Sequence, residues 1–294
     1  MKAAIFWFGV IIVQTFSSLV ISAPLTFNTA LPVSKGETIL RVQYLITKSK
    51  DDSSKLDRNT KAWSVVSTVA YGLSPKLAVF ATIPYTHRQM ETFDANRSTT
   101  GIADSQFIGR YTLYHRDFQG GTARIAPLLG LKIPTGSDNE RDKQGRLPRG
   151  LQLGTGSWDS FGGVVVTYAS VNWEVDAQFS YRENRQANGF ELGDISRFDA
   201  SLQYRLSPQN LDENTSHFFN GVLEVNWINQ NRNTYNGLKD RGSGGVIVYL
   251  VPGAQYITQR WIIEAGIQIP VRQQLNDSAL KKDYIVRTSI RANF

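Results

Sequence analysis

The last twelve residues of the chain, 283–294, read DYIVRTSIRANF. In an extended strand, successive side chains point to opposite faces. One face of this stretch carries Tyr284, Val286, Thr288, Ile290, Ala292 and Phe294. The other face carries Ile285, Arg287, Ser289, Arg291 and Asn293. One face is therefore mostly apolar and the other is suited to water, which predicts a wall strand between an apolar medium and a polar interior.

The same alternation returns along the chain after residue 36. Residues 172–182 are the clearest example, because Trp, Val, Ala, Phe and Tyr alternate there with polar and charged side chains. A soluble sandwich does not need so many charges on one strand face. The pattern predicts about twelve strands, at residues 37–47, 61–72, 77–85, 103–114, 122–133, 157–168, 172–182, 195–206, 219–228, 246–256, 261–272 and 283–294. We expect an all-β fold, a transmembrane antiparallel up-and-down β-barrel formed by residues 37–294, with an even number of strands.

The connections between these strands alternate between long polar loops and tight turns, such as residues 73–75 and 169–171. Long loops outside, short turns in the periplasm and both termini in the periplasm are typical of outer-membrane barrels. This pattern predicts a protein of the outer membrane of a Gram-negative bacterium, in contact with outer-membrane lipid and lipopolysaccharide.

Aromatic residues gather near both ends of the apolar register, where amphipathic rings prefer the headgroup level. They predict two membrane girdles. At the long-loop end the girdle consists of Trp63, Tyr85, Trp158, Tyr181, Trp227 and Tyr284. At the short-turn end it consists of Tyr71, Tyr168, Trp173, Tyr204, Tyr256, Trp261 and Phe294.

The composition excludes several classes of protein. The chain has 294 residues, a formal net charge of +7 and no cysteine, which excludes disulfides, cysteine metal sites and a lipid-anchored cysteine. The basic residues are scattered, so nucleic acid is not expected as a partner. Mean hydropathy is −0.26, and a hydropathy scan alone would indicate a soluble chain. Such a scan misses barrel strands, because they are apolar only at alternate residues.

The N-terminus predicts export. Residues 1–23 begin with Met1 and Lys2, continue with an apolar core over residues 3–13 and end with the small residues Ser22 and Ala23, which indicates a cleavable signal peptide. The alternative is an uncleaved anchor helix. Residues 24–36 contain two prolines and no clear period, so we expect a short leader in the periplasm or in the barrel lumen.

Five phrases of the chain resemble a known family. They are YGLSPKLAVFATIPY (71–85), GIADSQFIGRY (101–111), GLKIPTG (130–136), LGTGSWD (153–159) and VPGAQYITQRWIIEAGIQIPV (251–271). In this order they resemble the outer-membrane β-barrel family named after the MetA pathway of phenol degradation. The resemblance implies a transporter of small, aromatic or hydrophobic solutes and supplies no catalytic residues. Residues 101–104 read GIAD where the family usually has Gly-Asp-Leu, so the local turn there is expected to differ.

The closing strand, which ends on an aromatic residue, also resembles the last strand of bacterial outer-membrane barrels. In those proteins the terminal Phe is part of the signal for assembly. The resemblance implies that the barrel-assembly machinery is a partner during biogenesis and that Phe294 contributes to that recognition.

The inward register predicts a charged lumen. The predicted pore-lining residues are Arg41, Arg110, Arg124, Lys132, Glu174, Asp176, Arg182, Arg197, Asp199, Arg205, Glu224, Glu264, Arg272, Arg287 and Arg291. Antiparallel pairing should bring Glu174 near Arg205, Arg182 near Arg197, and Glu264 near Arg291. Basic groups outnumber acids, which favours the passage of anions.

The same charges permit a second interpretation, in which the pairs only fill and crosslink the lumen. Side chains nearly fill barrels of eight strands, and open channels appear at about sixteen. We therefore expect a narrow passage, or one constricted by residues 24–36. An inward apolar patch of Phe80, Phe161, Ile247, Tyr249 and Val251 could contact a hydrophobic solute or pack around the leader.

Three functions remain open at this point. The first is a channel or transporter that passes small solutes passively. The second is a structural or adhesion barrel with a closed lumen and functional outer loops. The third is a hydrolase on the lipid face that uses His87 and Ser105, although no nucleophile motif supports it. We expect no enzyme activity and assign no catalytic residue, cofactor or metal. Asp138, Glu140 and Asp142 alternate in one loop, but Lys143 stands where a calcium loop needs its glycine.

Overall fold

The computed structural model describes residues 22–294, apart from residues 51, 55 and 211–214. The predicted signal peptide, residues 1–23, lies outside the described residues except for Ser22 and Ala23. Among the described residues there is no helix long and apolar enough to cross a membrane.

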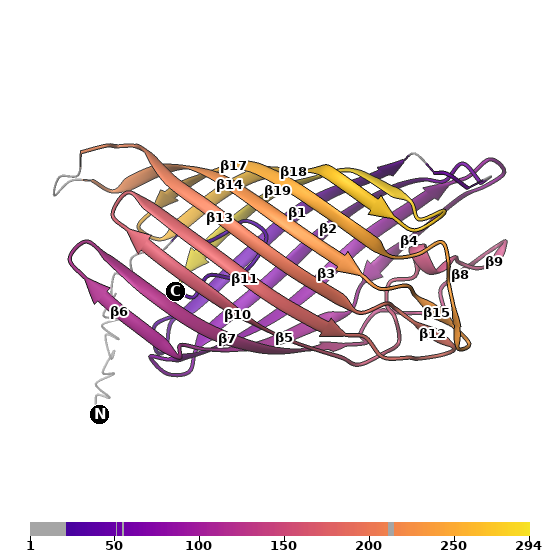
Figure 1. The fold of residues 1–294 in the computed structure, drawn as a ribbon, viewed down its shortest axis with the longest axis horizontal. Coiled ribbons are helices and arrows are strands. Elements are labelled where there is room, and N and C mark those ends of the chain that lie inside the picture. The colour runs from indigo at the N-terminus through magenta and orange to yellow at the C-terminus, as the bar shows by residue number, and fades with distance from the viewer. Residues whose placement is uncertain (1–21, 51, 55, 211–214) are drawn as a thin grey trace, which may run out of the picture.

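A single antiparallel sheet closes on itself to form the barrel (Figure 1). Its strands are β1 (Thr38–Lys50), β2 (Asn59–Gly72), β3 (Leu77–Glu91), β4 (Asn96–Ile102), β5 (Ser105–Tyr111), β6 (Tyr114–Phe118), β7 (Gly121–Ile133), β10 (Asp159–Ser170), β11 (Trp173–Glu183), β13 (Ile195–Ser207), β14 (His217–Gln230), β17 (Gly245–Thr258), β18 (Trp261–Leu275) and β19 (Lys281–Asn293). The last strand, β19, pairs with β1 and closes the wall. Because β4, β5 and β6 are successive segments of one wall strand, the barrel has twelve strands. The predicted fold class is therefore confirmed.

The fourth wall strand differs from its prediction as one continuous strand over residues 103–114. It leaves the sheet at Ala103 and Asp104, between β4 and β5. Pro84 on β3 has no N–H to offer at this point, and its carbonyl accepts the Ala103 N–H at 2.8 Å. The Asp104 carboxylate accepts backbone N–H groups of Gly136 and Thr155, at 3.1 and 2.9 Å. The break thus anchors the long loop that follows β7.

Long loops gather at one end of the barrel and short turns at the other, as predicted (Figure 1). The loop end carries β8 (Arg141–Asp142), β9 (Gly145–Arg146), the 3₁₀ helix η1 (Arg149–Leu151), β12 (Phe190–Glu191), β15 (Thr234–Tyr235) and β16 (Leu238–Lys239). Within the loop after β7, Leu147, Leu151, Gln152 and Leu153 are buried. This loop folds over the mouth of the barrel and is not a solvated polar loop.

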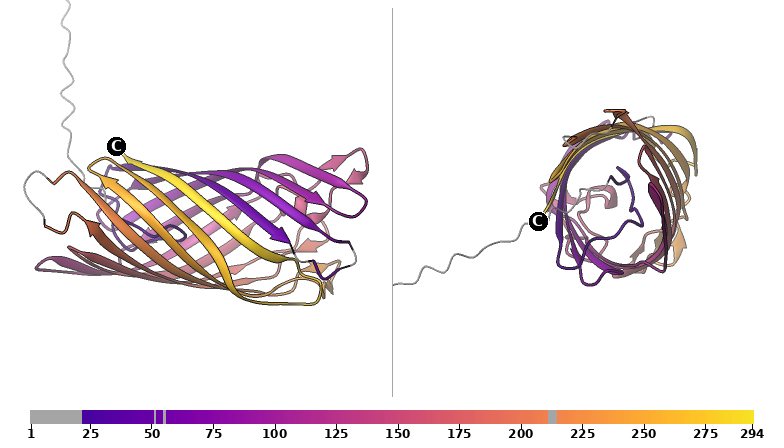
Figure 2. Two further views of the ribbon diagram at one scale, coloured as in Figure 1. Left: turned by 90° about the horizontal axis from the view of Figure 1, so that it is seen from above. Right: turned by 90° about the vertical axis from the view of Figure 1, so that its left-hand side faces the viewer.

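The leader lies inside the barrel, where the view along the barrel axis shows it within the ring of strands (Figure 2). Three apolar clusters form the core, and each contains one leader residue. Leu25 packs with Val222, Tyr249 and Val251, Ala30 with Ala126, Leu128 and Val165, and Val33 with Ala70 and Ala78. The expected inward patch is thus divided among these clusters, and its members pack around the leader.

One wall glycine allows the leader to leave the lumen. A Cβ atom at Gly72 would lie 1.9 Å from the carbonyl oxygen of Ser34. Gly72 also accepts the Gly36 N–H at 2.8 Å and donates its own N–H to Glu37 at 3.1 Å. Only glycine permits so close an approach between leader and wall.

Candidate functional site

The inward charged residues occupy the lumen, with one exception. The structure places on the inward register, buried or half-buried, Arg41, Arg110, Arg124, Lys132, Glu174, Asp176, Arg182, Arg197, Asp199, Arg205, Glu224, Glu264, Arg287 and Arg291. Asp176, Asp199 and Glu224 are completely shielded from solvent. The lumen is thus a packed polar interior rather than a wide water-filled pore.

The exception is Arg272, for which the prediction is wrong. The pairing of β17 with β18 shifts by one residue between Val248 and Tyr249, so that Tyr249 faces Pro270 while Val248 faces Arg272. Val248 lies opposite Trp227 on the outward register, and directly opposed residues share a face. The β-bulge therefore turns Arg272 to the outside, where it is exposed.

Glu224 on β14 is the main anchor of the leader. Its Oε1 accepts the backbone N–H of Leu25 at 2.6 Å, and its Oε2 accepts the Thr26 hydroxyl at 2.5 Å. Asn226, two residues further along the same strand, donates to Thr26 Oγ1 at 2.9 Å. Both carboxylate oxygens are thus used to hold two consecutive leader residues.

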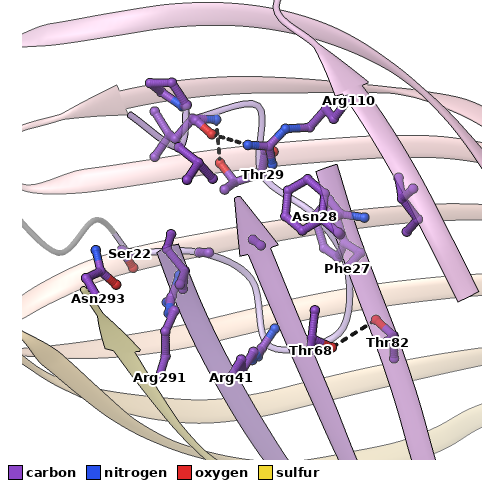
Figure 3. Close-up of a pocket in the computed structure, with 18 of the residues that line it drawn as sticks. Ser22, Phe27, Asn28, Thr29, Arg41, Thr68, Thr82, Arg110, Arg291 and Asn293 are labelled. Atoms are coloured by element: carbon purple, nitrogen blue, oxygen red, sulfur yellow. Dashed lines mark hydrogen bonds between the residues drawn. The ribbon is translucent and has the colours of Figure 1, made fainter. Parts of the chain in front are cut away.

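Arginine side chains hold the leader by donating hydrogen bonds to its backbone carbonyl groups (Figure 3). Arg110 on β5 donates to the carbonyls of Thr29 and Leu31, and the second bond is 2.5 Å long. Arg41 on β1 donates to the Leu25 carbonyl at 3.0 Å and also pairs with Glu264. These bonds satisfy backbone groups that would otherwise be buried without partners.

The expected cross-strand pairs are found only in part. Arg291 lies 4.0 Å from Glu264, as predicted. The other two pairs are diagonal neighbours on the inward face: Glu174 lies opposite Gln203, two residues from Arg205, and Arg182 lies opposite Ile195, two residues from Arg197.

Neutral groups bond to the side chains of these two diagonal pairs. Arg205 donates to Asn172, Arg182 donates to Gln106 Oε1 at 3.2 Å, and Glu174 accepts from Thr29 at 3.4 Å. Arg197 pairs with Asp199 on its own strand. The predicted pore-lining residues are all charged, so that prediction leaves out inward polar residues such as Gln106 and Asn172, although the same alternation places them on this face.

Beside the leader lies a cavity of about 480 Å³ at the short-turn end (Figure 3). Its wall side is formed by inward residues of β2, β3 and β5, namely Val66, Thr68, Ala70, Phe80, Thr82 and Ile108. Its charged groups are Arg41, Arg110, Arg291 and Glu37. The cavity is therefore lined by apolar and hydroxyl groups, with basic groups in excess.

A second cavity, of about 580 Å³, lies at the loop end. It is lined by Ser64, Pro84 and Thr86 of β2 and β3 and by Gln152 and Leu153 of the covering loop. Its charged groups are Arg58, Arg88, Lys132, Arg149, Arg182, Asp104 and Asp240. The sequence analysis missed Arg88, because it ended the third strand at residue 85 whereas β3 continues to Glu91.

The outside of the barrel carries the predicted aromatic residues. Exposed on it are Tyr71, Tyr85, Trp158, Tyr168, Trp173, Tyr181, Tyr204, Tyr256, Trp261 and Phe294, and half-buried are Trp63, Trp227 and Tyr284. Several rings contact each other along the wall, including Trp63 with Tyr85 at 6.1 Å and Tyr168 with Trp173 at 5.0 Å. Apolar side chains between the two bands are also exposed, such as Phe179 and Leu202, which suits contact with lipid.

The structure does not bring the proposed hydrolase pair together. His87 Nδ1 lies 2.7 Å from Thr100 Oγ1, and its ring stacks on Trp63 at 5.6 Å. Ser105 is buried and its hydroxyl lies 2.9 Å from that of Thr135. Within the described part of the chain, no group of three or more His, Cys, Asp or Glu side chains has the arrangement of a metal site.

Comparisons with solved structures support the fold. The chain is similar to the COG4313 outer membrane channel from Pseudomonas putida F1, with a TM-score of 0.70 and 15% identity over 93% of this chain and 100% of that one. It is also similar to the β domain of the Bordetella autotransporter BrkA, with a TM-score of 0.50 and 10% identity over 89% of this chain and 100% of that one. No family model matches the sequence, and no curated protein matches it.

The closed antiparallel wall, the exposed apolar surface and the two aromatic bands define an outer-membrane β-barrel. Such a barrel satisfies every wall N–H and C=O between strands, which is what a lipid environment requires. The protein thus belongs in the outer membrane of a Gram-negative bacterium, with its wall in contact with lipid, as the sequence predicted.

Proposed function

We propose that the protein is an outer-membrane channel of the MetA-like type, which passes small solutes passively along one side of its lumen. The observation that carries this proposal is the position of the two cavities. Val66 and Thr82 line the first cavity, and their inward neighbours Ser64 and Pro84 line the second. The cavities therefore meet the same two strands at adjacent inward positions. A path along β2 and β3 would join the two cavities.

The lining of this path supports a class of solute. Three guanidinium groups next to the cavities have neutral acceptors: Arg110 binds leader carbonyls, Arg88 the Gln152 carbonyl and Arg182 the Gln106 side chain. Their charge is not cancelled by a bonded carboxylate, so the path favours anions. The apolar and hydroxyl wall favours a small apolar or aromatic body. A small aromatic carboxylate combines both properties.

Planar-bilayer recording tests the proposal directly. We expect small conductance steps. In a KCl gradient, the sign of the reversal potential should indicate that anions pass in preference to cations. Liposomes containing the protein should admit benzoate faster than an uncharged sugar of similar size. Absence of both conductance and flux would refute the channel.

The second candidate is a structural or adhesion barrel with a closed lumen, in which the outer loops carry the function. It is favoured by the leader itself, which fills the lumen at three apolar clusters. The recordings separate the two candidates, because a closed barrel would show no conductance at any voltage.

The barrel-assembly machinery remains the proposed partner during biogenesis, and lipopolysaccharide the proposed neighbour in the outer leaflet.

A further inference from the structure

We propose that the outward face of β18, β19, β1 and β2 binds the phosphate groups of a phosphorylated glycolipid of the outer leaflet. Five cations lie on this face near the loop end: Lys48, Lys50, Lys61, Arg272 and Lys281, named here the outer cation cluster. The four strands are neighbours in the wall (Figure 1). This proposal does not depend on the transport function.

The register of the sheet places these cations directly against each other. Lys48 lies opposite Lys61, and Lys50 lies opposite Lys281. Like charges at directly opposed positions of an antiparallel pair are destabilising. An anion near the ammonium groups relieves this repulsion. Asp283 supplies one for Lys48 at 3.9 Å, and phosphate oxygens are suitable acceptors for the other ammonium groups.

Arg272 joins the cluster because of the β-bulge in β18. The bulge turns its side chain outward. The side chain of the next residue, Gln273, forms hydrogen bonds with the backbone of β19. The Gln273 amide donates to the Lys282 carbonyl and accepts the Lys282 N–H, both at 2.9 Å. Arg272 is thus held beside the start of β19, where Lys281 lies. A guanidinium group there can bind a phosphate with two parallel hydrogen bonds.

The cluster lies at the height of a lipid headgroup. Lys48 is directly opposite Tyr284, and Lys61 is two residues from Trp63 on the same face. Trp63 contacts the Tyr44 ring at 6.5 Å and the His87 ring at 5.6 Å. This aromatic group is suited to the boundary between acyl chains and headgroups, and the cations follow immediately on the loop side.

Acidic groups near the cluster neutralise it only in part. Asp283 forms an ion pair with Lys48 at 3.9 Å, whereas no ion pair of the other four cations is found among the described residues. Glu91, beyond Lys61, accepts hydrogen bonds from Asn59 and Gln89. On another part of the wall, at the loop ends of β11 and β13, Glu183 pairs with Arg185 at 3.8 Å and Asp194 accepts a hydrogen bond from the Tyr181 hydroxyl. The charges there are balanced, whereas the outer cation cluster on β18, β19, β1 and β2 has an excess of cations.

Titration of the refolded, lipopolysaccharide-free barrel in detergent with lipid A, followed by native mass spectrometry, tests the site. We expect one tightly held bisphosphorylated lipid A. The double variant Lys48→Gln/Lys61→Gln should bind it roughly 25-fold more weakly, since each cation near a membrane surface contributes about fivefold. The control Lys143→Gln/Lys239→Gln removes two exposed loop lysines and should bind as the wild type does.

Two further binding measurements identify the ligand. Dephosphorylated lipid A should bind at least tenfold more weakly than the bisphosphorylated form, and millimolar inorganic phosphate should not displace the lipid. Equal binding by the double variant and its control, or displacement by phosphate alone, would overturn the proposal. If the double variant fails to fold, Lys281→Gln at the exposed strand end provides the same comparison with one charge removed, for which about fivefold weaker binding is expected.

Discussion

Glu224→Gln should release the leader from the lumen without harming the barrel. Glu224 is completely buried, and its two oxygens accept the Leu25 N–H at 2.6 Å and the Thr26 hydroxyl at 2.5 Å. Glutamine has nearly the same shape but only one acceptor oxygen. It can keep the bond to Leu25, but its NH₂ group donates where the carboxylate accepted, so the Thr26 O–H loses its charged acceptor.

The magnitude follows from these bonds. A hydrogen bond to a charged group contributes about 1.5 to 3 kcal/mol. The substitution removes one such bond and makes the other neutral, so we expect a loss of about 2 kcal/mol from leader docking. Because 1.4 kcal/mol corresponds to a factor of ten, the undocked population should rise by roughly thirtyfold.

Single-channel recording measures this population as the frequency and duration of larger openings. The matched control is Glu174→Gln, which removes the same charge from a buried inward glutamate whose contact with the leader is a single 3.4 Å bond to Thr29. Wild type and control should show rare openings, and Glu224→Gln frequent ones. Equal behaviour of the two variants would refute the argument, because the effect would then come from lumen charge and not from the leader.

Three further predictions concern assembly, selectivity and pH. Deleting Phe294, whose backbone N–H and C=O close the wall on β1, should lower the folded fraction seen as heat-modifiable mobility on gels; normal folding would contradict this role. Arg291→Ala should shift the reversal potential toward cations while the outward Arg272→Ala leaves it unchanged, and equal shifts would contradict the register. The hydrogen bond from Arg58 holds the pKa of Asp52 well below its ordinary value, so the stability it adds is present above the unfolded pKa and is lost as pH falls through the lower folded pKa. Limited proteolysis should therefore leave this loop intact in the wild type both at pH 5 and at neutral pH. The same treatment should cut the loop in Asp52→Asn at neutral pH. Equal resistance of the variant would show that the ion pair does not hold the loop.

The period of two explains why most of the fold was predictable. Each wall strand must present one face to lipid and the other to the lumen, so the sequence shows the face of each residue wherever the strand is regular. The inward positions of the fourteen charges and the outward positions of the thirteen predicted girdle residues follow from this rule.

The rule fails where the strand is irregular. A β-bulge adds one residue and reverses the faces beyond it, which is why Arg272 was assigned to the lumen. Pro270 is the signal that could have revealed it, because proline within a sheet occurs mainly at edges and bulges. The break at Ala103 and Asp104 follows the same logic, with Pro84 on the neighbouring strand.

The position of the leader could not be derived from the period of two. Residues 24–36 have no repeat, and their docking depends on groups from strands far apart in the sequence, such as Arg41, Arg110 and Glu224. These contacts appear only when the barrel closes. The sequence therefore allowed two places for the leader, and only the closed structure distinguishes them.

The leader divides the lumen into two chemically different sides. Its N–H groups and hydroxyls cover acceptors of β10, β11 and β14, including Thr167, Gln178 and Glu224. The first cavity, on the other side, is lined by Arg41, Arg110, Arg291 and Glu37, and Glu224 is not among its lining residues. While the leader is docked, a solute in this cavity therefore meets mainly basic groups. Release of the leader would expose the acidic side as well, so opening the lumen and weakening its preference for anions should occur together.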